Sequence, residues 1–465
     1  MVKVINPATL EVIGEWQEDS ASQIQEKFSK AQSAQKKWQE EGLSKRTDVI
    51  GHFSELLQKN QERLARLLTE EMGKPICQSR AEISATPERI QFFMDQSPKA
   101  IQEEIVLDIK GKIQEKITLE PLGVIAHISV WNYPFFVGLN VLIPALLMGN
   151  AVLYKPSEYT TLTGRAILDL FQQAGIPEGV ISGVFGKGKT GAQLLKLPLN
   201  GVFFTGSYGT GKKISEERAA YLSKIQLELG GKDPAFVCDD LNEKNLKAAA
   251  HSLADGAFYN AGQSCCSVER IYVHKKVYDD FLKEFVSAVK SFKMGNPLDE
   301  NVYLGPLTRK EQISVLENQI KDALQKGGKL ILGGKKDPDL SGYYFQPTII
   351  TATNHTMSVM KEESFGPIIG IQRVKNDQEA LELMNDTEYG LTATVYCTDQ
   401  KRAEKLLSKI NSGTCYWNCC DRVSARLPWS GRKHSGIGTT LSHYGISTFL
   451  QPKAWHLKSI LKQVL

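Results

Sequence analysis

The sequence predicts an α/β protein built on a doubly wound parallel sheet, and two regions carry that prediction. Across residues 124–237, short apolar runs alternate with helical stretches, and the runs read VIAHIS, AVLYK, VISGVF, GVFFTG and KIQLEL. Strands that alternate with crossover helices are typical of a parallel sheet. A second α/β region covers residues 239–426, with strand candidates RIYVH, KLILGG, QPTII and TATVYC. The length of 465 residues agrees with two or three domains.

The first hundred residues predict helices. Apolar residues recur there at helical spacing, first at positions 24, 28, 31 and 38 and then at 49, 50, 53, 56 and 57. Gly73 and Pro75 mark the end of a helix. The sequence then becomes β-rich over residues 105–119, around Lys110-Gly111-Lys112, and this pattern predicts a hairpin.

Two later segments stand out by their hydropathy. The most apolar stretch, residues 137–154, contains Asn140, Pro144 and Asn150, which favours buried core over a membrane span. The last residues, 448–465, form an apolar and basic tail that we interpret as an arm or an extra edge strand.

Composition narrows the class of protein. Hydrophobic residues make up 42% and charged residues 23%, as in ordinary globular proteins, and a net charge of +4 is too small to suggest a nucleic-acid surface. The start of the chain, MVKVINPATL, lacks the apolar region of a signal peptide, so we expect a cytoplasmic protein with no membrane partner. Eight cysteines without a CxxC pair, and histidines without HxxxH spacing, predict no metal site.

Two glycine-rich segments predict phosphate-binding turns. Residues 183–190, GVFGKGKT, fit the P-loop pattern GxxxxGK[ST], and residues 186–191 fit GxGxxG. A second segment, FTGSYGTG over residues 204–211, follows the next strand, and its small residues allow close approach to a pyrophosphate. Each segment alone is equally a tight turn that opens a helix. Two such turns in one βαβ region favour a dinucleotide site over a nucleotide hydrolase.

Three side chains have the chemistry of a catalytic site. Cys265 and Cys266 follow a flexible glycine in NAGQSCC, where a thiol gains exposure, and spacing does not decide which of them reacts. Glu228 lies inside the apolar run LELGG, where burial would raise its pKa as a general base near neutrality requires. Asn132 offers an amide that can stabilise an oxyanion. The alternatives are a core cysteine, a solvated glutamate and a helix cap.

Taken together, these segments resemble the NAD(P)-dependent aldehyde dehydrogenase superfamily over almost the whole chain. The matching motifs, in the order of the family, are EMGKP (71–75), PLGVIAHISVWNYP (121–134), KPSE (155–158), FTGS (204–207), LELGGKDP (227–234), NAGQSC (260–265), EESFGP (362–367) and PWSGRKHSG (428–436). One motif can recur by accident, but eight in order and at similar spacing do not.

The resemblance implies a Rossmann-like cofactor domain, an α/β catalytic domain and a small β oligomerisation element. The NAD-binding domain would comprise residues 1–104 and 122–230, and the catalytic domain residues 231–435. The oligomerisation element would join residues 105–121 to 440–465 in a homodimer or homotetramer.

The resemblance also implies roles for individual residues. Cys265 matches the nucleophile, Asn132 the oxyanion donor and Glu228 the base. The residues that match or border the cofactor site are Trp131, Lys155, Ser157, Glu158, Gly206, Ser207, Gly230, Glu363 and Phe365. By position relative to the catalytic residues, the substrate pocket should be lined by Tyr133, Val137, Asn140, Ser264, Cys266 and Trp429.

The chemistry implied is oxidation of an aldehyde to a carboxylic acid through a cysteine thiohemiacetal and a thioester. A carboxylate at Glu158 would bind a free 2′-hydroxyl and repel a 2′-phosphate, which favours NAD, with NADP possible because Lys155 and Ser157 are near. Polar pocket positions favour a small or polar aldehyde or a semialdehyde. The alternatives are a succinate-semialdehyde-type enzyme, a P-loop nucleotide hydrolase and a non-catalytic homologue.

Three departures from the family pattern bear on substrate and proton transfer. Thr439-Thr440 stands where many members carry Arg-Glu, so a proton-relay carboxylate is missing, and Trp429 replaces the common Phe. Succinic semialdehyde dehydrogenases usually carry Arg at the position of Asn140. Arg422 and Arg426 precede Trp429 and either meet a substrate carboxylate at the tunnel mouth or are solvated or contact a neighbouring subunit.

Overall fold

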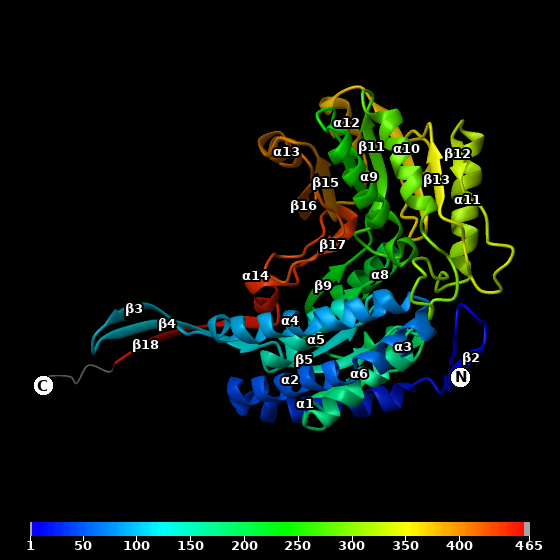
Figure 1. Ribbon diagram of the computed structural model, residues 1–465. Coiled ribbons are helices and arrows are strands. Elements are labelled where there is room, and N and C mark those ends of the chain that lie inside the picture. Colours follow the sequence, from blue (N-terminus) through cyan, green and yellow to red (C-terminus); the bar gives the residue numbers. More distant parts are fainter. Residues whose placement is uncertain (1, 460–465) are drawn as a thin grey trace, which may run out of the picture.

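The computed structural model describes residues 2–459 and places two mostly parallel sheets one above the other (Figure 1). The first sheet has the order β17-β9-β8-β5-β6-β7. Its strands are β5 (Val124–Ile128), β6 (Ala151–Lys155), β7 (Ile181–Gly183), β8 (Gly201–Thr205), β9 (Lys224–Glu228) and the short antiparallel β17 (Gly436–Ile437). All five predicted runs are therefore strands. The chain builds outward from β5 to β7 and then returns to the other side of β5 with β8, which puts the topological switch point between β5 and β8.

Helices cover this sheet. They are α1 (Ala21–Glu40), α2 (Gly42–Lys59), α3 (Gln61–Met72), α4 (Ile76–Ala100), α5 (Phe136–Leu147), α6 (Thr161–Gln173), α7 (Gly188–Leu194) and α8 (Tyr208–Ala219). Gly73, with φ of 87°, ends α3 where the sequence predicts a stop. The apolar stretch 137–154 is α5 and β6, both almost wholly buried, as predicted. Within residues 2–459, no helix is long and apolar enough to cross a membrane.

The prediction of helices is wrong for the first residues, which form the antiparallel pair β1 (Val2–Ile5) and β2 (Val12–Trp16). Val2 and Val4 are buried while Lys3 and Ile5 are exposed, which is the period of two of a strand. The turn between the strands contains Pro7, which cannot donate a backbone hydrogen bond.

The second sheet has the order β12-β13-β14-β11-β10-β15-β16. Its strands are β10 (Asp233–Val237), β11 (Val268–His274), β12 (Lys329–Leu332), β13 (Thr348–Thr351), β14 (Ile368–Val374), β15 (Thr392–Tyr396) and β16 (Thr414–Trp417), with helices α9 (Glu243–Phe258), α10 (Tyr278–Lys290), α11 (Glu311–Gln325), α12 (Asp377–Asn385) and α13 (Gln400–Leu407). The four strands predicted in this region are present. β10, β14 and β16 were not predicted: β10 opens on Asp233 and Pro234, β14 contains Gly370, and β16 is only four residues long.

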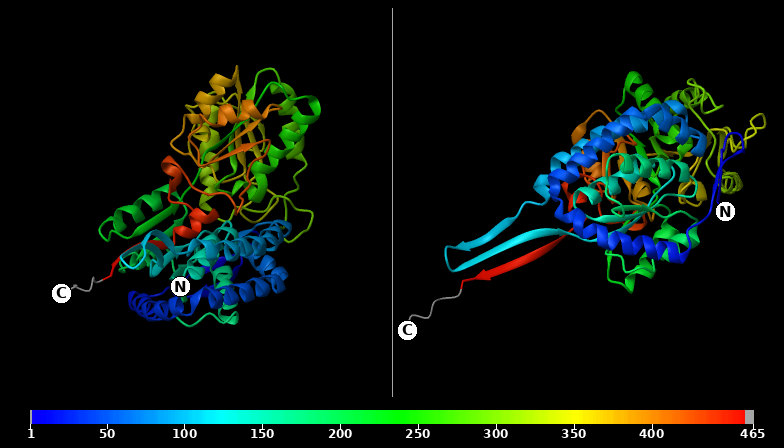
Figure 2. Two further views of the ribbon diagram at one scale, coloured as in Figure 1. Left: turned by 90° about the vertical axis from the view of Figure 1, so that its left-hand side faces the viewer. Right: turned by 90° about the horizontal axis from the view of Figure 1, so that it is seen from below.

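A three-stranded sheet projects from the body (Figures 1 and 2). It pairs β3 (Glu104–Ile109) with β4 (Ile113–Pro121), around the predicted turn, and pairs β4 with β18 (Leu450–Lys458). The predicted tail is thus an edge strand as far as residue 458, and residues 460–465 lie outside the described part of the chain. Of the predicted segment 440–465, α14 (Ser442–Ser447) does not join this sheet but packs on α4 and α5.

Candidate active site

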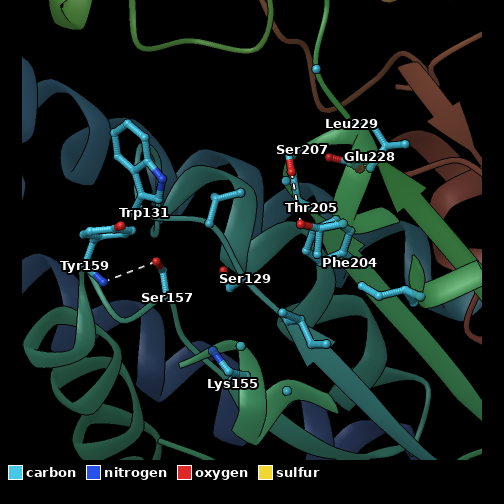
Figure 3. Close-up of a pocket in the computed structure, with 18 of the residues that line it drawn as sticks. Ser129, Trp131, Lys155, Ser157, Tyr159, Phe204, Thr205, Ser207, Glu228 and Leu229 are labelled. Carbon is cyan, nitrogen blue, oxygen red and sulfur yellow. Dashed lines mark hydrogen bonds between the residues drawn. The ribbon is translucent and has the colours of Figure 1, made fainter. Parts of the chain in front are cut away.

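Two cavities meet at Cys265. The larger, of about 760 Å³, lies along the carboxyl ends of β5, β6, β8 and β9, and Figure 3 shows part of its lining. The smaller, of about 400 Å³, lies between α4, α5 and the segment 421–429. Val137, Glu228 and Cys265 line both. All nine predicted cofactor residues line the larger cavity, and all six predicted pocket residues line the smaller one.

Sheet topology explains why residues far apart in sequence line the larger cavity. The loops that follow β5, β6 and β8 leave the same edge of the sheet, at the switch point, where crevices form in doubly wound folds. These loops deliver Trp131, Ser157 and Ser207, which surround the same space in Figure 3. The sequence motifs therefore meet because they end neighbouring parallel strands.

The loop that carries Cys265 is held rigidly. Asn260 and Ala261 adopt left-handed backbone angles, and a Cβ on Gly262 would lie 2.3 Å from the Gly366 carbonyl oxygen. The Gln263 side chain accepts a hydrogen bond from the Thr308 N–H at 2.9 Å. Cys265 is thereby fixed in place, partly exposed, at the junction of the two cavities.

The neighbouring Cys266 has a different environment. It is only 4% exposed and its thiol donates a hydrogen bond to Asp421 at 2.9 Å. A hydrogen bond with the Cys265 thiol, burial and the Asp421 charge together raise the pKa of Cys266 well above its ordinary value. The reactive thiolate form of Cys266 is therefore disfavoured, a distinction that spacing in the sequence does not make.

Glu228 ends β9 as a buried carboxyl group between the cavities. It is 7% exposed, and burial raises its pKa to about 7, the direction that its place in an apolar run predicts. The Thr440 hydroxyl donates a hydrogen bond to its carboxylate, and the pairing of β17 with β9 brings Thr440 to this position. A base with a pKa near 7 is poised for proton transfer at neutral pH.

Asn132 lies in the turn between β5 and α5. Its side-chain amide donates to the Gln263 carbonyl at 3.0 Å, which ties this turn to the cysteine loop. Glu82 of α4 accepts the Phe135 and Phe136 N–H groups at 2.9 and 3.1 Å and thus fixes the start of α5.

A buried lysine supports this arrangement. Lys74, from the EMGKP motif, forms an ion pair with Glu82, and both side chains are at most 1% exposed. The Lys74 ammonium also lies 3.8 Å from the centre of the Tyr133 ring. The motif thus acts on the site through Glu82 and Tyr133, a link that the sequence alone does not show.

A second buried ion pair holds the segment of Glu363 and Phe365. Lys232 and Glu269 lie 2.6 Å apart, and Glu269 accepts the Ser364 N–H at 2.8 Å and the Phe365 N–H at 3.0 Å. Glu363 accepts the Gly231 N–H at 3.1 Å, and burial raises its pKa to about 8.

Position 230 must be a glycine because the Glu363 side chain lies close to its backbone. A Cβ at this position would lie 2.3 Å from the Glu363 carboxylate. The LELGGKDP and EESFGP motifs therefore fit against each other across the larger cavity.

The chemistry of the larger cavity fits a dinucleotide. Lys155 lies 3.9 Å from the Glu158 carboxylate, a pair able to bind ribose hydroxyls. Ser207 precedes α8, whose free N–H groups and dipole favour a pyrophosphate. The residues present and the cavity volume thus agree with the cofactor that the sequence implies.

The P-loop-like segment is not a phosphate cradle. Glu18 accepts hydrogen bonds from the Lys187 N–H at 3.2 Å and the Thr190 hydroxyl at 3.0 Å, and Asp19 accepts the Phe185 N–H at 2.7 Å. Two carboxylates therefore take the donors that a triphosphate would need and repel its charge. Gly188 and Gly191 instead line the larger cavity.

Sequence reasoning missed Arg89, which lines the smaller cavity from α4 and is 8% exposed. Arginines in amphipathic helices usually face solvent, so nothing in the local pattern signals a buried one. Arg422 and Arg426, predicted at the tunnel mouth, also line this cavity, but both are exposed, and Arg426 lies 3.3 Å from Glu88.

The larger cavity lies at the switch point of a doubly wound sheet and has room for a dinucleotide. It opens to a second cavity at a cysteine. This arrangement is typical of the class of nicotinamide-dependent α/β oxidoreductases. Residues 1–455 match the aldehyde dehydrogenase family. The chain belongs to this family and is an NAD(P)-dependent oxidoreductase.

Named relatives agree with the assignment. The chain is 32% identical to succinate semialdehyde dehydrogenase [NAD(P)+] Sad of Escherichia coli, over 96% of this chain and 95% of that protein. It is 33% identical to betaine aldehyde dehydrogenase of Bacillus subtilis, over 97% and 92%. It is similar in structure to an NADP-dependent enzyme of E. coli, with a TM-score of 0.95, 31% identity and coverage of 98% and 95%.

Proposed function

We propose that this protein oxidises a small or polar aldehyde to the carboxylic acid through a covalent intermediate on Cys265. The observation that supports this most is the position of Cys265, partly exposed where the two cavities meet and beside the buried Glu228. A substrate in the smaller cavity and a dinucleotide in the larger one would both reach this sulfur.

The Cys265 thiolate attacks the aldehyde carbonyl carbon and forms a thiohemiacetal. The negative oxygen accepts hydrogen bonds from the Cys265 N–H and from the Asn132 amide, which has one N–H free besides that bound to Gln263. The residues of the larger cavity, among them Lys155, Glu158 and Ser207, would hold a nicotinamide dinucleotide, which would supply the acceptor for the hydride that leaves this carbon. Cys265 is then acylated as a thioester.

Glu228 completes the reaction by removing a proton from water, whose oxygen attacks the thioester carbon and releases the acid and the Cys265 thiolate. Its raised pKa suits this step, because the ionised carboxylate is a stronger base than an ordinary one. The Thr440 hydroxyl holds the carboxylate in the resting state, in the place where relatives carry a glutamate.

We propose NAD as the preferred cofactor. The Glu158 carboxylate lines the larger cavity beside Lys155, and a carboxylate there binds a free 2′-hydroxyl but repels a 2′-phosphate.

Two serine variants test the covalent step. Cys265→Ser should lower kcat for aldehyde oxidation by roughly 10³-fold or more, because a serine hydroxyl stays protonated at neutral pH and is a weaker nucleophile than a thiolate. Cys266→Ser is the matched control and should keep most of the activity. Mass spectrometry under turnover should find an acyl group on Cys265. An active Cys265→Ser enzyme, or an acyl group found on Cys266, would refute the proposal.

A further inference from the structure

The smaller cavity contains a buried cation that the reaction itself does not use. The Arg89 guanidinium donates to the Asn140 side-chain oxygen at 3.0 Å and to the Val423 carbonyl at 3.1 Å, and it lies 4.3 Å from the centre of the Phe136 ring. Three elements, α4, α5 and the segment 421–429, thus hold it in one orientation. A guanidinium has five N–H donors, so three remain for another partner.

Arg89 has no carboxylate partner within the described chain. Its bonds in residues 2–459 go to an amide, a carbonyl and an aromatic face, and none of the ion pairs there includes it. Burial lowers its pKa to about 10, which still leaves the group charged at neutral pH. An unpaired buried charge is costly, and an anionic ligand would remove that cost.

Asn140 extends the set of donors. Because its oxygen accepts from Arg89, its NH₂ group is the atom left to meet a ligand, and that nitrogen has no hydrogen-bond partner among residues 2–459. Arg89 and Asn140 together therefore present only hydrogen-bond donors to the cavity. Such a pair suits a carboxylate, which only accepts and matches the fork of a guanidinium.

The acidic groups near the cavity are already paired. Asp421 accepts from the Cys266 thiol at 2.9 Å and from the Ser264 hydroxyl at 3.3 Å, and Glu82 is paired with Lys74. Asp255 accepts from the Tyr303 hydroxyl, and Glu228 from Thr440. Glu88, which also lines the cavity, is exposed and lies 3.3 Å from Arg426. Each of these acidic groups thus has a donor of its own, whereas Arg89 and Asn140 have N–H groups left for an anionic ligand.

We infer that Arg89 and Asn140 bind the carboxylate of a semialdehyde whose aldehyde carbon is presented to Cys265. The inference rests on the proposed function, because it names the substrate class of the same site. It assigns recognition to the buried Arg89 of α4 and not to Arg422 and Arg426, which line the same cavity but are exposed. Arg89 is a specificity-determining residue in this arrangement, because its hydrogen bonds go to Asn140 and Val423 and not to Cys265, Glu228 or Asn132.

Matched substrates test the inference. Succinic semialdehyde and its neutral methyl ester have the same carbon chain, so their kcat/KM ratio isolates the charge. Wild-type enzyme should favour the semialdehyde by at least 10-fold. Arg89→Met should lower the ratio of kcat/KM for the semialdehyde to kcat/KM for the ester by roughly 10- to 100-fold. The Arg89 charge also acts on Glu228, but that effect is common to both substrates and cancels in the ratio. Arg89→Lys should restore part of the difference.

A second readout does not depend on turnover of the semialdehyde. Succinate should inhibit oxidation of the methyl ester by the wild type, and Arg89→Met should raise the inhibition constant at least 10-fold. Arg80→Met is the control, because Arg80 also belongs to α4 but pairs at the surface with Glu62 and Glu300. This variant should behave as the wild type in both assays.

An equal loss of kcat/KM on both substrates in a folded Arg89→Met enzyme would overturn the inference. So would a wild-type enzyme that prefers betaine aldehyde, or one that has the same kcat/KM for the semialdehyde and the ester. If Arg89→Met does not fold, the comparison of the semialdehyde with the ester in the wild-type enzyme still tests the inference. Failure of the proposed function looks different, because aldehyde oxidation would then persist in Cys265→Ser whatever the charge of the substrate.

Discussion

At the scale of single residues, environment gives chemically similar groups different roles. Cys265 and Cys266 are adjacent in sequence, but only Cys265 reaches both cavities, while Cys266 is buried against Asp421. Glu228 and Glu82 are both buried carboxyl groups, but Glu82 has a lysine partner, whereas Glu228 accepts from the neutral donors Thr440 and Gln226. Burial raises the pKa of Glu228 to about 7.

Thr440 controls this pKa. Its hydroxyl donates to the ionised carboxylate and so lowers the pKa of Glu228 below the value that burial alone would give. Thr440→Val removes the donor, disfavours the charged form and should raise the pKa by about one unit. The ionised form of Glu228 is the base. The pH at which the rate of thioester hydrolysis rises should therefore shift from about 7 to a higher value.

The measurement is the pH dependence of kcat under conditions in which hydrolysis limits turnover, with Thr439→Val as the neighbouring control. A pH profile that stays in place in Thr440→Val would show that another group acts as the base.

At the scale of secondary-structure elements, α4 organises the substrate side of the site. It carries Glu82, which caps the start of α5, and, two turns later, Arg89, which reaches Asn140 of the same helix α5. Residues seven positions apart lie on one face of a helix. One face of α4 thus holds the turn that contains Asn132, through Glu82, and carries Arg89 into the smaller cavity.

Lys74→Met should test the buried ion pair that anchors this face. The change leaves Glu82 as an unpaired buried charge and should lower the free energy of unfolding by about 3–5 kcal/mol. Urea unfolding of Lys74→Met measures the loss, and adding Glu82→Gln should recover part of it because the unpaired charge is gone. A single variant as stable as the wild type would contradict this account.

At the scale of the whole molecule, the projecting sheet joins the core at its base through Leu450 but leaves β3 exposed along its whole length. Its side chains include exposed apolar groups, at Ile105 (56%), Val106 (57%) and Leu457 (43%). It stands away from the body in the views of Figures 1 and 2. We propose that a second copy of the chain covers it, since exposed apolar groups gathered on one element indicate an interface.

Replacing Val106 and Leu107 together by lysine should weaken this association. The charges would have to be buried at the interface, so sedimentation velocity should show a shift toward smaller species at equal concentration. Leu222→Lys is the control, because Leu222 is 95% exposed and lies outside this sheet. Unchanged sedimentation of the double variant would place the interface elsewhere.

Much of the fold follows from local sequence. The strands β5, β6 and β8 are mostly apolar, because parallel strands are covered on both faces, and such runs are visible in the sequence. The strands β1, β2, β10, β14, β16 and β17 were missed. All but β14 are at most five residues long and depend on their pairing partners, and β14 contains Gly370, which strands disfavour. Four motifs that line the larger cavity end the strands β5, β6, β8 and β9 of one sheet, whereas EESFGP reaches it from the start of β14 in the other sheet.

The sequence by itself determined the family, the doubly wound architecture and the candidate residues at Cys265, Glu228 and Asn132. Tertiary structure decided how those residues are tuned. Thr440 reaches Glu228 across 212 positions, Glu18 fills the P-loop-like turn and Arg89 turns inward to Asn140. The physical reason is that pattern and composition act over a few residues, whereas the charge state and partners of a buried group depend on whatever the fold packs around it.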